Sequence, residues 1–381
     1  MSSHAAARCA LSLHPLSKYR LPCPRFSEPQ ELLSFSYDEH RKVCLDNREI
    51  KYYYRPNLSP APCLFDGVEK QIRRDHTANE HIDGLLTALA HLHQKAPNQP
   101  NPPAHKADFV MYRGMLTRIF TTPYNTRDSW AMNATRVGST IYIEDNVTSE
   151  RIAERAGSSG THQKLMYSGY KFETLCVLDQ PPEQLERGGL LDSALSSRLD
   201  AVVDTNREYC SVFRTRLGNH SIVSGAEVDC IDHEKPLSAP NRSYRELKTS
   251  AVLDNPHKVD SFERHKLLKF WAQSFIAGIP TVTVGFRDYN GMLCSIEDFR
   301  TQDIPRLVKN KQGMWQANVC MCFADQVLQL IKGCVVDEGP EMQYRIAYDS
   351  ACQEVQITSL GKLEEPFLTK EYISLVTGTH Q

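Results

Sequence analysis

The sequence predicts an α/β (α+β) fold in which mixed β-sheets are flanked by helices. β-Branched and aromatic residues gather in short runs at 211–216, 221–229 and 243–249, as they do in strands. A long helix is predicted at 260–277 because apolar residues recur there at helical spacing, and Gly278 and Pro280 end it. Strands and helices mixed in this order indicate a sheet core covered by helices.

Length and composition narrow the class of protein. The chain has 381 residues, of which 41% are hydrophobic and 24% are charged, and these proportions exclude collagen-like, coiled-coil and wholly disordered chains. No apolar run approaches the ~20 residues that a membrane span needs, so no membrane partner is expected. At ~150 residues per domain the length predicts two or three domains, although one large mixed domain is also compatible with it.

Charge and cysteine content exclude some kinds of nucleic-acid binding. There are 44 lysines and arginines against 46 acidic residues, so the net charge is −2 and any nucleic acid must be held in a local site rather than by a basic coat. The 12 cysteines are scattered without a Cys-x-x-Cys pair, which argues against zinc knuckles. Because the N-terminus has no secretory signal pattern, we expect reduced thiols in an intracellular protein.

The N-terminal quarter is predicted to contain extended segments and one helix. Residues 1–25 have several prolines and no apolar periodicity, which predicts an arm that is poorly ordered. Short strands are predicted at 32–37 and 50–54. Thr77-Ala-Asn-Glu80 has the spacing of a capping box, and the apolar residues that follow at 82–92 predict an amphipathic helix.

The rest of the chain mixes strands, helices and loops. Residues 96–103 have the Pro/Asn-rich composition of a linker. The other predicted elements are loops at 157–160 and 181–189, strands at 109–112, 137–143 and 281–286, a turn at Asn290-Gly291, and helices at 165–178 and 318–332.

Two short acidic motifs carry the chemistry. Glu227-Val-Asp229 ends one predicted strand, and Glu246-Leu-Lys248 lies in the next. Side chains two apart on a strand share a face, so three carboxylates and one ammonium would meet if the strands are neighbours. Packing like charges together is costly unless a cation neutralises them, and hard oxygen ligands select magnesium or manganese. The motifs therefore predict a metal site, although solvated charges on an edge strand would give the same short pattern.

The Glu-x-Lys strand pair resembles the acidic motif of restriction-endonuclease-like (PD-(D/E)xK) nucleases. Longer phrases resemble one particular family, the DXO-type decapping and exoribonuclease family: Arg113-Gly-Met-Leu-Thr-Arg-Ile-Phe-Thr-Thr-Pro-Tyr124, Gly169-Tyr-Lys-Phe-Glu173, Tyr209-Cys-Ser-Val-Phe-Arg-Thr-Arg-Leu-Gly218, Gly225-Ala-Glu-Val-Asp229, Glu246-Leu-Lys-Thr-Ser250, Arg264-His-Lys-Leu-Leu-Lys-Phe-Trp-Ala-Gln273 and Gly285-Phe-Arg287. These phrases recur in the family's order between about Phe26 and Phe367. The resemblance therefore implies one decapping-nuclease domain at 26–381 with a restriction-endonuclease-like core.

The resemblance also implies the ligands of the metal site. Glu173, which would otherwise be an ordinary surface glutamate, matches a helix glutamate that joins the strand carboxylates. The implied ligands are Glu173, Glu227, Asp229, Glu246 and the backbone carbonyl of Leu247. Two ions, Mg²⁺ or Mn²⁺, are expected, and they would orient and activate a water for in-line attack on a phosphodiester. The four carboxylates and Lys248 form the expected catalytic set.

Further residues match substrate contacts of the family. Lys248 and Gln273 match residues beside the scissile phosphate, and Glu227 also matches a substrate contact. The other matches are Tyr112, Arg113 and Gly114 at the family's Arg-Gly step, Arg41 and Glu80 at contacts to the RNA or its cap, and Cys210 at a contact to the RNA. Four of these have a structural alternative: a buried ion pair for Arg113, a surface position for Arg41, the capping box for Glu80 and the core for Cys210.

The resemblance implies one chemistry, hydrolysis of a phosphodiester at the 5′ end of single-stranded RNA to leave a 5′ monophosphate. Unmethylated caps, 5′ triphosphate (as pyrophosphate) and NAD caps would be removed, and successive cleavage would be 5′→3′ exoribonuclease activity. Residues 185–206 resemble the fungal, RAI-like branch, whose members bind a nuclear 5′→3′ exoribonuclease, so that partner and a nuclear location are expected on this ground. The alternatives are a mainly non-catalytic stabilising partner of that exoribonuclease and a DNA nuclease with the same metal site.

Overall fold

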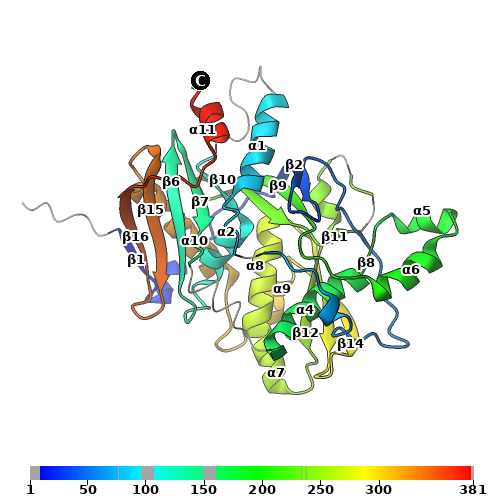
Figure 1. Cartoon of the computed structure of the whole chain (residues 1–381). Coiled ribbons are helices and arrows are strands. Elements are labelled where there is room, and N and C mark those ends of the chain that lie inside the picture. The colour runs from blue at the N-terminus through cyan, green and yellow to red at the C-terminus, as the bar shows by residue number, and fades with distance from the viewer. Residues whose placement is uncertain are drawn as a thin grey trace, which may run out of the picture.

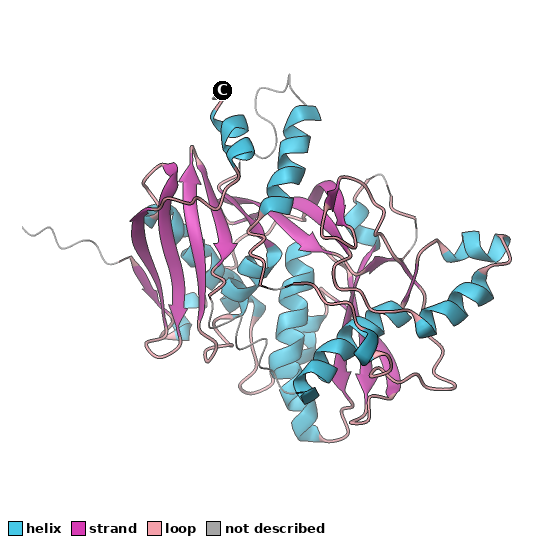
Figure 2. Cartoon of the chain, viewed as in Figure 1, coloured by secondary structure: helices cyan, strands magenta, loops and turns pink. Residues whose placement is uncertain are grey.

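The computed structural model describes residues 9–75, 77–95, 107–148, 160–232, 234–236 and 238–378. Two β-sheets and the helices around them make up the fold (Figure 1), and the secondary-structure view separates the strands from the helices that cover them (Figure 2). The expected α/β class, with mixed sheets flanked by helices, is confirmed. In the part of the chain that is described, no helix is long and apolar enough to cross a membrane.

In the described part of the chain, the larger sheet has ten strands. Their spatial order is β1 (Ala10–Ser12), β16 (Glu354–Lys362), β15 (Gly339–Asp349), β6 (Trp130–Val137), β7 (Thr140–Asp145), β5 (Phe109–Tyr112), β10 (His220–Glu227), β9 (Glu208–Leu217), β2 (Gln30–Tyr37) and β3 (Val43–Cys44). Most neighbours are antiparallel, but β5 lies parallel to both β7 and β10. This parallel pairing brings the carboxyl ends of β5 and β10 to the same edge of the sheet.

The smaller sheet has six strands, in the order β14 (Leu293–Arg300), β13 (Thr281–Arg287), β12 (Tyr244–Ala251), β11 (Cys230–Ile231), β4 (Tyr52–Tyr53) and β8 (Val177–Leu178). The chain leaves the larger sheet at the end of β10 and enters the smaller one at β11, three residues later. The two sheets are therefore joined directly at the segment that carries the first acidic motif.

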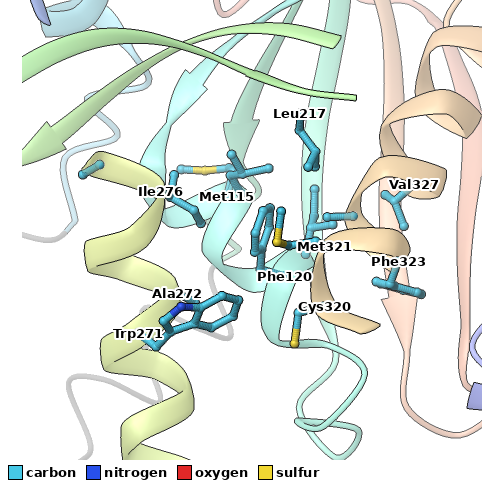
Figure 3. Close-up of a cluster of buried hydrophobic side chains, with 14 of the residues drawn as sticks. Met115, Phe120, Leu217, Trp271, Ala272, Ile276, Cys320, Met321, Phe323 and Val327 are labelled. Atoms are coloured by element: carbon cyan, nitrogen blue, oxygen red, sulfur yellow. The ribbon is translucent and has the colours of Figure 1, made fainter. Parts of the chain in front are cut away.

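Helices fill and cover the space around the sheets. They are α1 (Asp83–Lys95), α2 (Arg113–Thr121), α4 (Gly160–Leu175), α5 (Pro182–Arg187), α6 (Leu191–Asp200), α7 (Pro256–Ser261), α8 (Leu267–Ala277), α9 (Ile304–Val308), α10 (Ala317–Cys334) and α11 (Lys370–Thr377), with 3-10 turns at Leu16–Tyr19, Val68–Lys70 and Pro240–Ser243. The main core joins α2, α8 and α10: Figure 3 shows Phe120 of α2 between Trp271 of α8 and Phe323 of α10. Burial of such large side chains, ~2 kcal/mol each, holds the helices against the strands.

The loop predicted at 181–189 is wrong, because α5 (Pro182–Arg187) occupies most of it and Pro182 stands at the helix start, where its missing N–H costs no hydrogen bond. Three other predicted elements have different bounds. The helix predicted at 260–277 is divided, because a π-helical turn at Phe262–Lys266 separates α7 from α8. The helix predicted at 165–178 begins earlier, at Gly160, and ends at Leu175, where the chain turns into β8. The strand predicted at 137–143 is two strands, since Gly138 adopts a positive φ of 59° and turns the chain between β6 and β7. The 96–103 linker and most of the 157–160 loop lie outside the described residues.

The N-terminal segment differs most from its prediction. From Cys9 onward it packs on the domain: β1 pairs with β16, and the side chains of Leu13 and Tyr19 are fully buried. Cys9 also forms a disulfide with Cys334 at the end of α10. The expectation of a poorly ordered arm is therefore wrong for 9–25, and the expectation of reduced thiols is wrong for this pair. Strand pairing across a sheet edge leaves no periodic signal in so short a segment.

Candidate nuclease site

The acidic motifs meet where the two sheets join. Glu227 is the last residue of β10 in the larger sheet, whereas Asp229 lies in the connection to β11. β11 pairs antiparallel with β12, with Cys230 opposite Arg245, so Asp229 comes beside Glu246. The prediction that Glu227 and Asp229 share a strand with a neighbour carrying Glu246 is thus corrected: β10 and β12 belong to different sheets, and the crossing between them brings the carboxylates together.

Glu246 is held between two cations. Its side chain is only 1% exposed, and its two oxygens contact Arg113 Nη1 at 2.9 Å and Lys248 Nζ at 2.6 Å. Burial opposes its ionisation, but Arg113 and Lys248 outweigh burial and lower the pKa of Glu246 to about 2. In return, Glu246 and Asp229 raise the pKa of Lys248 against the effect of burial. Glu246 is therefore a carboxylate, and Lys248 an ammonium, at any ordinary pH.

The other carboxylates are crowded rather than neutralised. Asp229 accepts a hydrogen bond from the backbone N–H of Leu247 at 2.6 Å and lies 3.9 Å from Lys248 Nζ, yet burial raises its pKa to about 6. Burial and the charges of Asp229 and Glu227 raise the pKa of Glu173 well above its usual range. Loss of contact with water and the nearby Glu208 raise the pKa of Glu227 to about 8. This part of the site carries more negative charge than its side chains can compensate.

The Arg-Gly step begins a helix rather than continuing a strand. β5 ends at Tyr112, and Arg113 and Gly114 are the first residues of α2. Arg113 is 9% exposed and its guanidinium pairs with Glu246, so the structural alternative for this arginine, a buried ion pair, is the arrangement observed. Tyr112 contacts the hydroxyl of Tyr37 at 3.1 Å, and Gly114 has open space where a side chain would project.

Arg41 and Glu80 belong to one charge network at the edge of the site. Glu80 accepts hydrogen bonds from both Arg41 and Arg74, and Glu208 pairs with the same two guanidinium groups. The capping-box prediction for Glu80 is therefore wrong, because Thr77 bonds to Asp75 instead and α1 begins only at Asp83. Two arginines draw the carboxylate away from the helix terminus.

Two members of that network, Arg74 and Glu208, are not predicted from the sequence. Glu208 is two residues before Cys210 on β9, and side chains at that spacing share a face of the strand. Its spacing from Cys210 is the feature of the sequence from which Glu208 could have been predicted. Arg74 stands in an irregular segment, and it offered no signal.

The remaining predicted residues, and two lysines that precede Gln273 in the chain, lie on the surrounding elements. Cys210 is 2% exposed and sits directly opposite Glu227 in the β9–β10 ladder, within a buried apolar cluster. Gln273 is half-buried on α8, the helix that packs on α2. Lys266 lies in the π-helical turn and donates to the carbonyl of Thr249 at 3.0 Å, whereas Lys269 is exposed. The structure thus brings the carboxylates, Lys248 and Arg113 together and places Gln273 on a neighbouring helix.

An open cavity of about 750 Å³ leads to the carboxylates. Glu173, Glu227 and Asp229 line it, and so do residues of α5 and α6, which project from the side of the molecule next to β8 (Figure 1). Cavities of several hundred cubic ångströms accommodate nucleotide-sized ligands. Buried Glu246 stands behind this opening.

The donors fit a hard divalent cation. All four side chains are carboxylates, and three of them have raised pKa values because they are buried and because negative charge is crowded there. Within the described ranges, no group of three or more acidic, cysteine or histidine side chains is close enough together to hold a metal ion, so the fit rests on the chemistry of the donors. The ammonium of Lys248 lies beside Glu246 and Asp229, where positive charge is required.

Crowded carboxylates, an adjacent lysine and a mixed-sheet core define a metal-dependent nuclease of the restriction-endonuclease type. The family model described as RAI1 like PD-(D/E)XK nuclease matches residues 27–373, and the chain belongs to this family. It is 36% identical over 375 residues to the decapping and exoribonuclease protein of Xenopus laevis, covering 96% of this chain and 90% of that protein. It is 37% identical over 336 residues to the decapping nuclease RAI1 of Neurospora crassa, covering 87% and 78%.

Solved structures agree on the fold. The crystal structure of Candida albicans Rai1 in complex with pU5 and Mn²⁺ superimposes with a TM-score of 0.84 at 24% identity, covering 97% of this chain and 99% of that one. The expected single large domain around one site is in keeping with this end-to-end match, and the chain is a phosphodiester hydrolase of the nuclease family.

Proposed function

We propose that this protein hydrolyses phosphodiesters at the 5′ end of single-stranded RNA and leaves a 5′ monophosphate. Unmethylated caps, 5′ triphosphates and NAD caps are its substrates, and successive turnover gives 5′→3′ exoribonuclease activity. The observation that carries the proposal is Glu246, held as a carboxylate between Arg113 and Lys248, behind a cavity whose lining includes Glu173, Glu227 and Asp229. Relatives named as decapping proteins, similar over most of the chain, support the choice of substrate.

The proposed metal ligands are Glu173, Glu227, Asp229, Glu246 and the carbonyl of Leu247, holding two Mg²⁺ or Mn²⁺ ions. When bound, such ions lower the pKa of a water and offset phosphate charge. The Mn²⁺ that accompanies pU5 in the Candida albicans Rai1 complex supports a divalent ion of this class.

The chain's own residues have separable roles in this proposal. Arg113 keeps Glu246 ionised and fixed in position, since it is too buried and too well paired to move freely. Lys248 brings its ammonium to the phosphate that enters beside Asp229. Gln273 positions the same phosphate from α8. A near-neutral chain suffices because only a few nucleotides enter the cavity.

A product analysis tests the proposal. RNAs of one sequence are given a triphosphate, an unmethylated cap, a methylated cap or an NAD cap, and each is incubated with Mg²⁺ or Mn²⁺. Wild-type protein should produce 5′-monophosphate RNA, whereas Glu246→Gln, which keeps the size of the side chain, should remove turnover without unfolding the protein. A wild-type protein that leaves all four RNAs intact would refute the function, and single-stranded DNA of the same sequence separates an RNA enzyme from a DNA nuclease.

Binding to a 5′→3′ exoribonuclease and residence in the nucleus stay proposals that rest on the family. The presence of all four expected acidic residues argues against a mainly non-catalytic role, because a protein that only stabilises a partner does not need them.

A further inference from the structure

The cavity has a second wall that the proposed chemistry does not use. α5 and α6 line the same cavity as the carboxylates, through Leu185, Ala194, Ser197 and Arg198. The C-terminal end of α6 is tied to α4 by Lys171, whose ammonium donates to the carbonyl of Leu199 at 2.7 Å. α4 also carries Glu173, so the helical wall is anchored to the element that supplies one of the carboxylates.

The charged residues on the cavity wall are not equivalent. Among the described residues, four cations line the cavity: Lys51, Arg74, Arg198 and Arg207. Three of them are neutralised by carboxylates: Lys51 pairs with Asp179 at 2.7 Å, Arg74 with Glu80 at 2.7 Å, and Arg207 with Glu49 at 2.8 Å. For Arg198, no carboxylate among the described residues lies within ion-pair distance.

Arg198 is nevertheless largely enclosed. Its side chain is 9% exposed, its Nη1 donates to the backbone carbonyl of Tyr54 at 2.8 Å, and its guanidinium lies 5.3 Å from the centre of the Tyr54 ring. Burial lowers its pKa from the usual value for arginine. A guanidinium has five N–H donors, and a buried cation without a counter-charge is costly unless an anion binds to it.

We propose that Arg198 binds a phosphate group of the substrate in this cavity. The inference rests on the proposed function, because it requires a polyphosphate or RNA chain to enter beside the carboxylates. A planar guanidinium with free donors matches the oxygens of a phosphate, and the ligand supplies the missing negative charge. The phosphate is either part of the 5′ phosphoanhydride or a phosphodiester further along the RNA, since both carry the same oxygens.

Arg198 has a rival role as a structural anchor through the Tyr54 carbonyl, and two substitutions separate the roles. Arg198→Gln keeps an amide N–H for that carbonyl but removes the charge, whereas Arg198→Lys keeps the charge but not the planar fork. Arg187 provides the matched control: it lies exposed on α5, outside the cavity, and its Nε donates to the backbone carbonyl of Glu183. Arg187→Gln removes the same charge from the same helical wall.

The experiment measures equilibrium binding of fluorescent single-stranded RNAs at several salt concentrations. All variants are made in the full-length Glu246→Gln protein so that the RNA is not cleaved, and RNAs with a triphosphate, a monophosphate or a hydroxyl at the 5′ end are compared. We expect Arg198→Gln to weaken binding by about tenfold or more, as loss of one charge-assisted contact does. The slope of log affinity against log salt should become shallower by about 0.7, the value for one phosphate contact of a single strand. Arg198→Lys should keep the slope, and Arg187→Gln should bind like its parent.

Comparison of the RNAs with three different 5′ ends shows which phosphate Arg198 binds. A loss confined to triphosphorylated RNA assigns Arg198 to the phosphoanhydride, and an equal loss for all three RNAs assigns it to the downstream chain. Unchanged affinity and slope in Arg198→Gln, or weaker binding with an unchanged slope and a lower melting temperature, would overturn the inference in favour of the anchor. That failure is distinct from failure of the proposed function, which is measured by turnover of capped RNA in the protein with Glu246 intact.

Discussion

Replacement of Arg113 by methionine tests whether the buried ion pair organises the site. The change removes the guanidinium that lies 2.9 Å from Glu246 and leaves a carboxylate that is 1% exposed. Loss of one partner from a buried pair costs about 3–5 kcal/mol. Glu246 still pairs with Lys248 Nζ at 2.6 Å, so we expect a loss of free energy of unfolding at the lower end of this range, about 3 kcal/mol.

The assay is equilibrium unfolding in urea, with Arg118→Met as the control. Arg118 lies on the same helix and pairs with Asp145, but the two side chains are 29% and 21% exposed, so its loss should cost about 1 kcal/mol or less. The double variant Arg113→Met/Glu246→Gln should lose at least about 1 kcal/mol less free energy of unfolding than the two single variants lose together. The reason is that the double variant no longer buries the charge of the Glu246 carboxylate. Equal costs for the two arginines, or strictly additive costs in the double variant, would refute this reasoning.

Four further outcomes are expected. Lys248→Met should reduce kcat on capped RNA by about 100-fold or more, because its ammonium no longer meets the phosphate. Mn²⁺ at about 100 times its dissociation constant should stabilise the wild type by about 2.7 kcal/mol in thermal unfolding, and Glu246→Gln should lose most of this effect. Glu80→Gln should lower the free energy of unfolding by about 1–2 kcal/mol, since two guanidinium groups lose their shared carboxylate. Finally, the hydrogen bond to Glu144 raises the pKa of His81, so its stabilising effect should be complete below pH ~6.5 and lost as pH rises through the raised value.

Each of these outcomes has a control. Lys269→Met alters an exposed lysine on α8 and should leave kcat nearly unchanged, so an equal loss in both variants contradicts the role of Lys248. Equal stabilisation of the wild type and Glu246→Gln by Mn²⁺ would place the ion elsewhere. Glu186→Gln changes an exposed glutamate and should stay within about 0.5 kcal/mol of the wild type. For His81→Asn, a stability difference from the wild type that is constant between about pH 5.5 and 9 would exclude the protonated pair.

Local patterns predicted much of the fold. The strands at 109–112 and 281–286 and the helix at 318–332 match β5, β13 and α10 within two residues, because apolar periodicity and β-branched runs report local structure. The predicted bounds are wrong where a single residue turns the backbone, as Gly138 does, or where a π-helical turn divides a helix at Phe262–Lys266. The capping box failed because two distant arginines bind Glu80 more strongly than a helix terminus does.

The sequence by itself determined the residue types of the site and the family, since the acidic motifs and their surrounding phrases are contiguous in the chain. Only the tertiary structure decided how the residues meet. Glu227 and Asp229 meet Glu246 through a crossing between two sheets, and Arg113 reaches Glu246 across 133 residues of chain. Arg198 lies in the same cavity without a carboxylate partner among the described residues. Long-range contacts leave no local periodicity, so a charge that is ordinary in the sequence becomes functional only when folding encloses it.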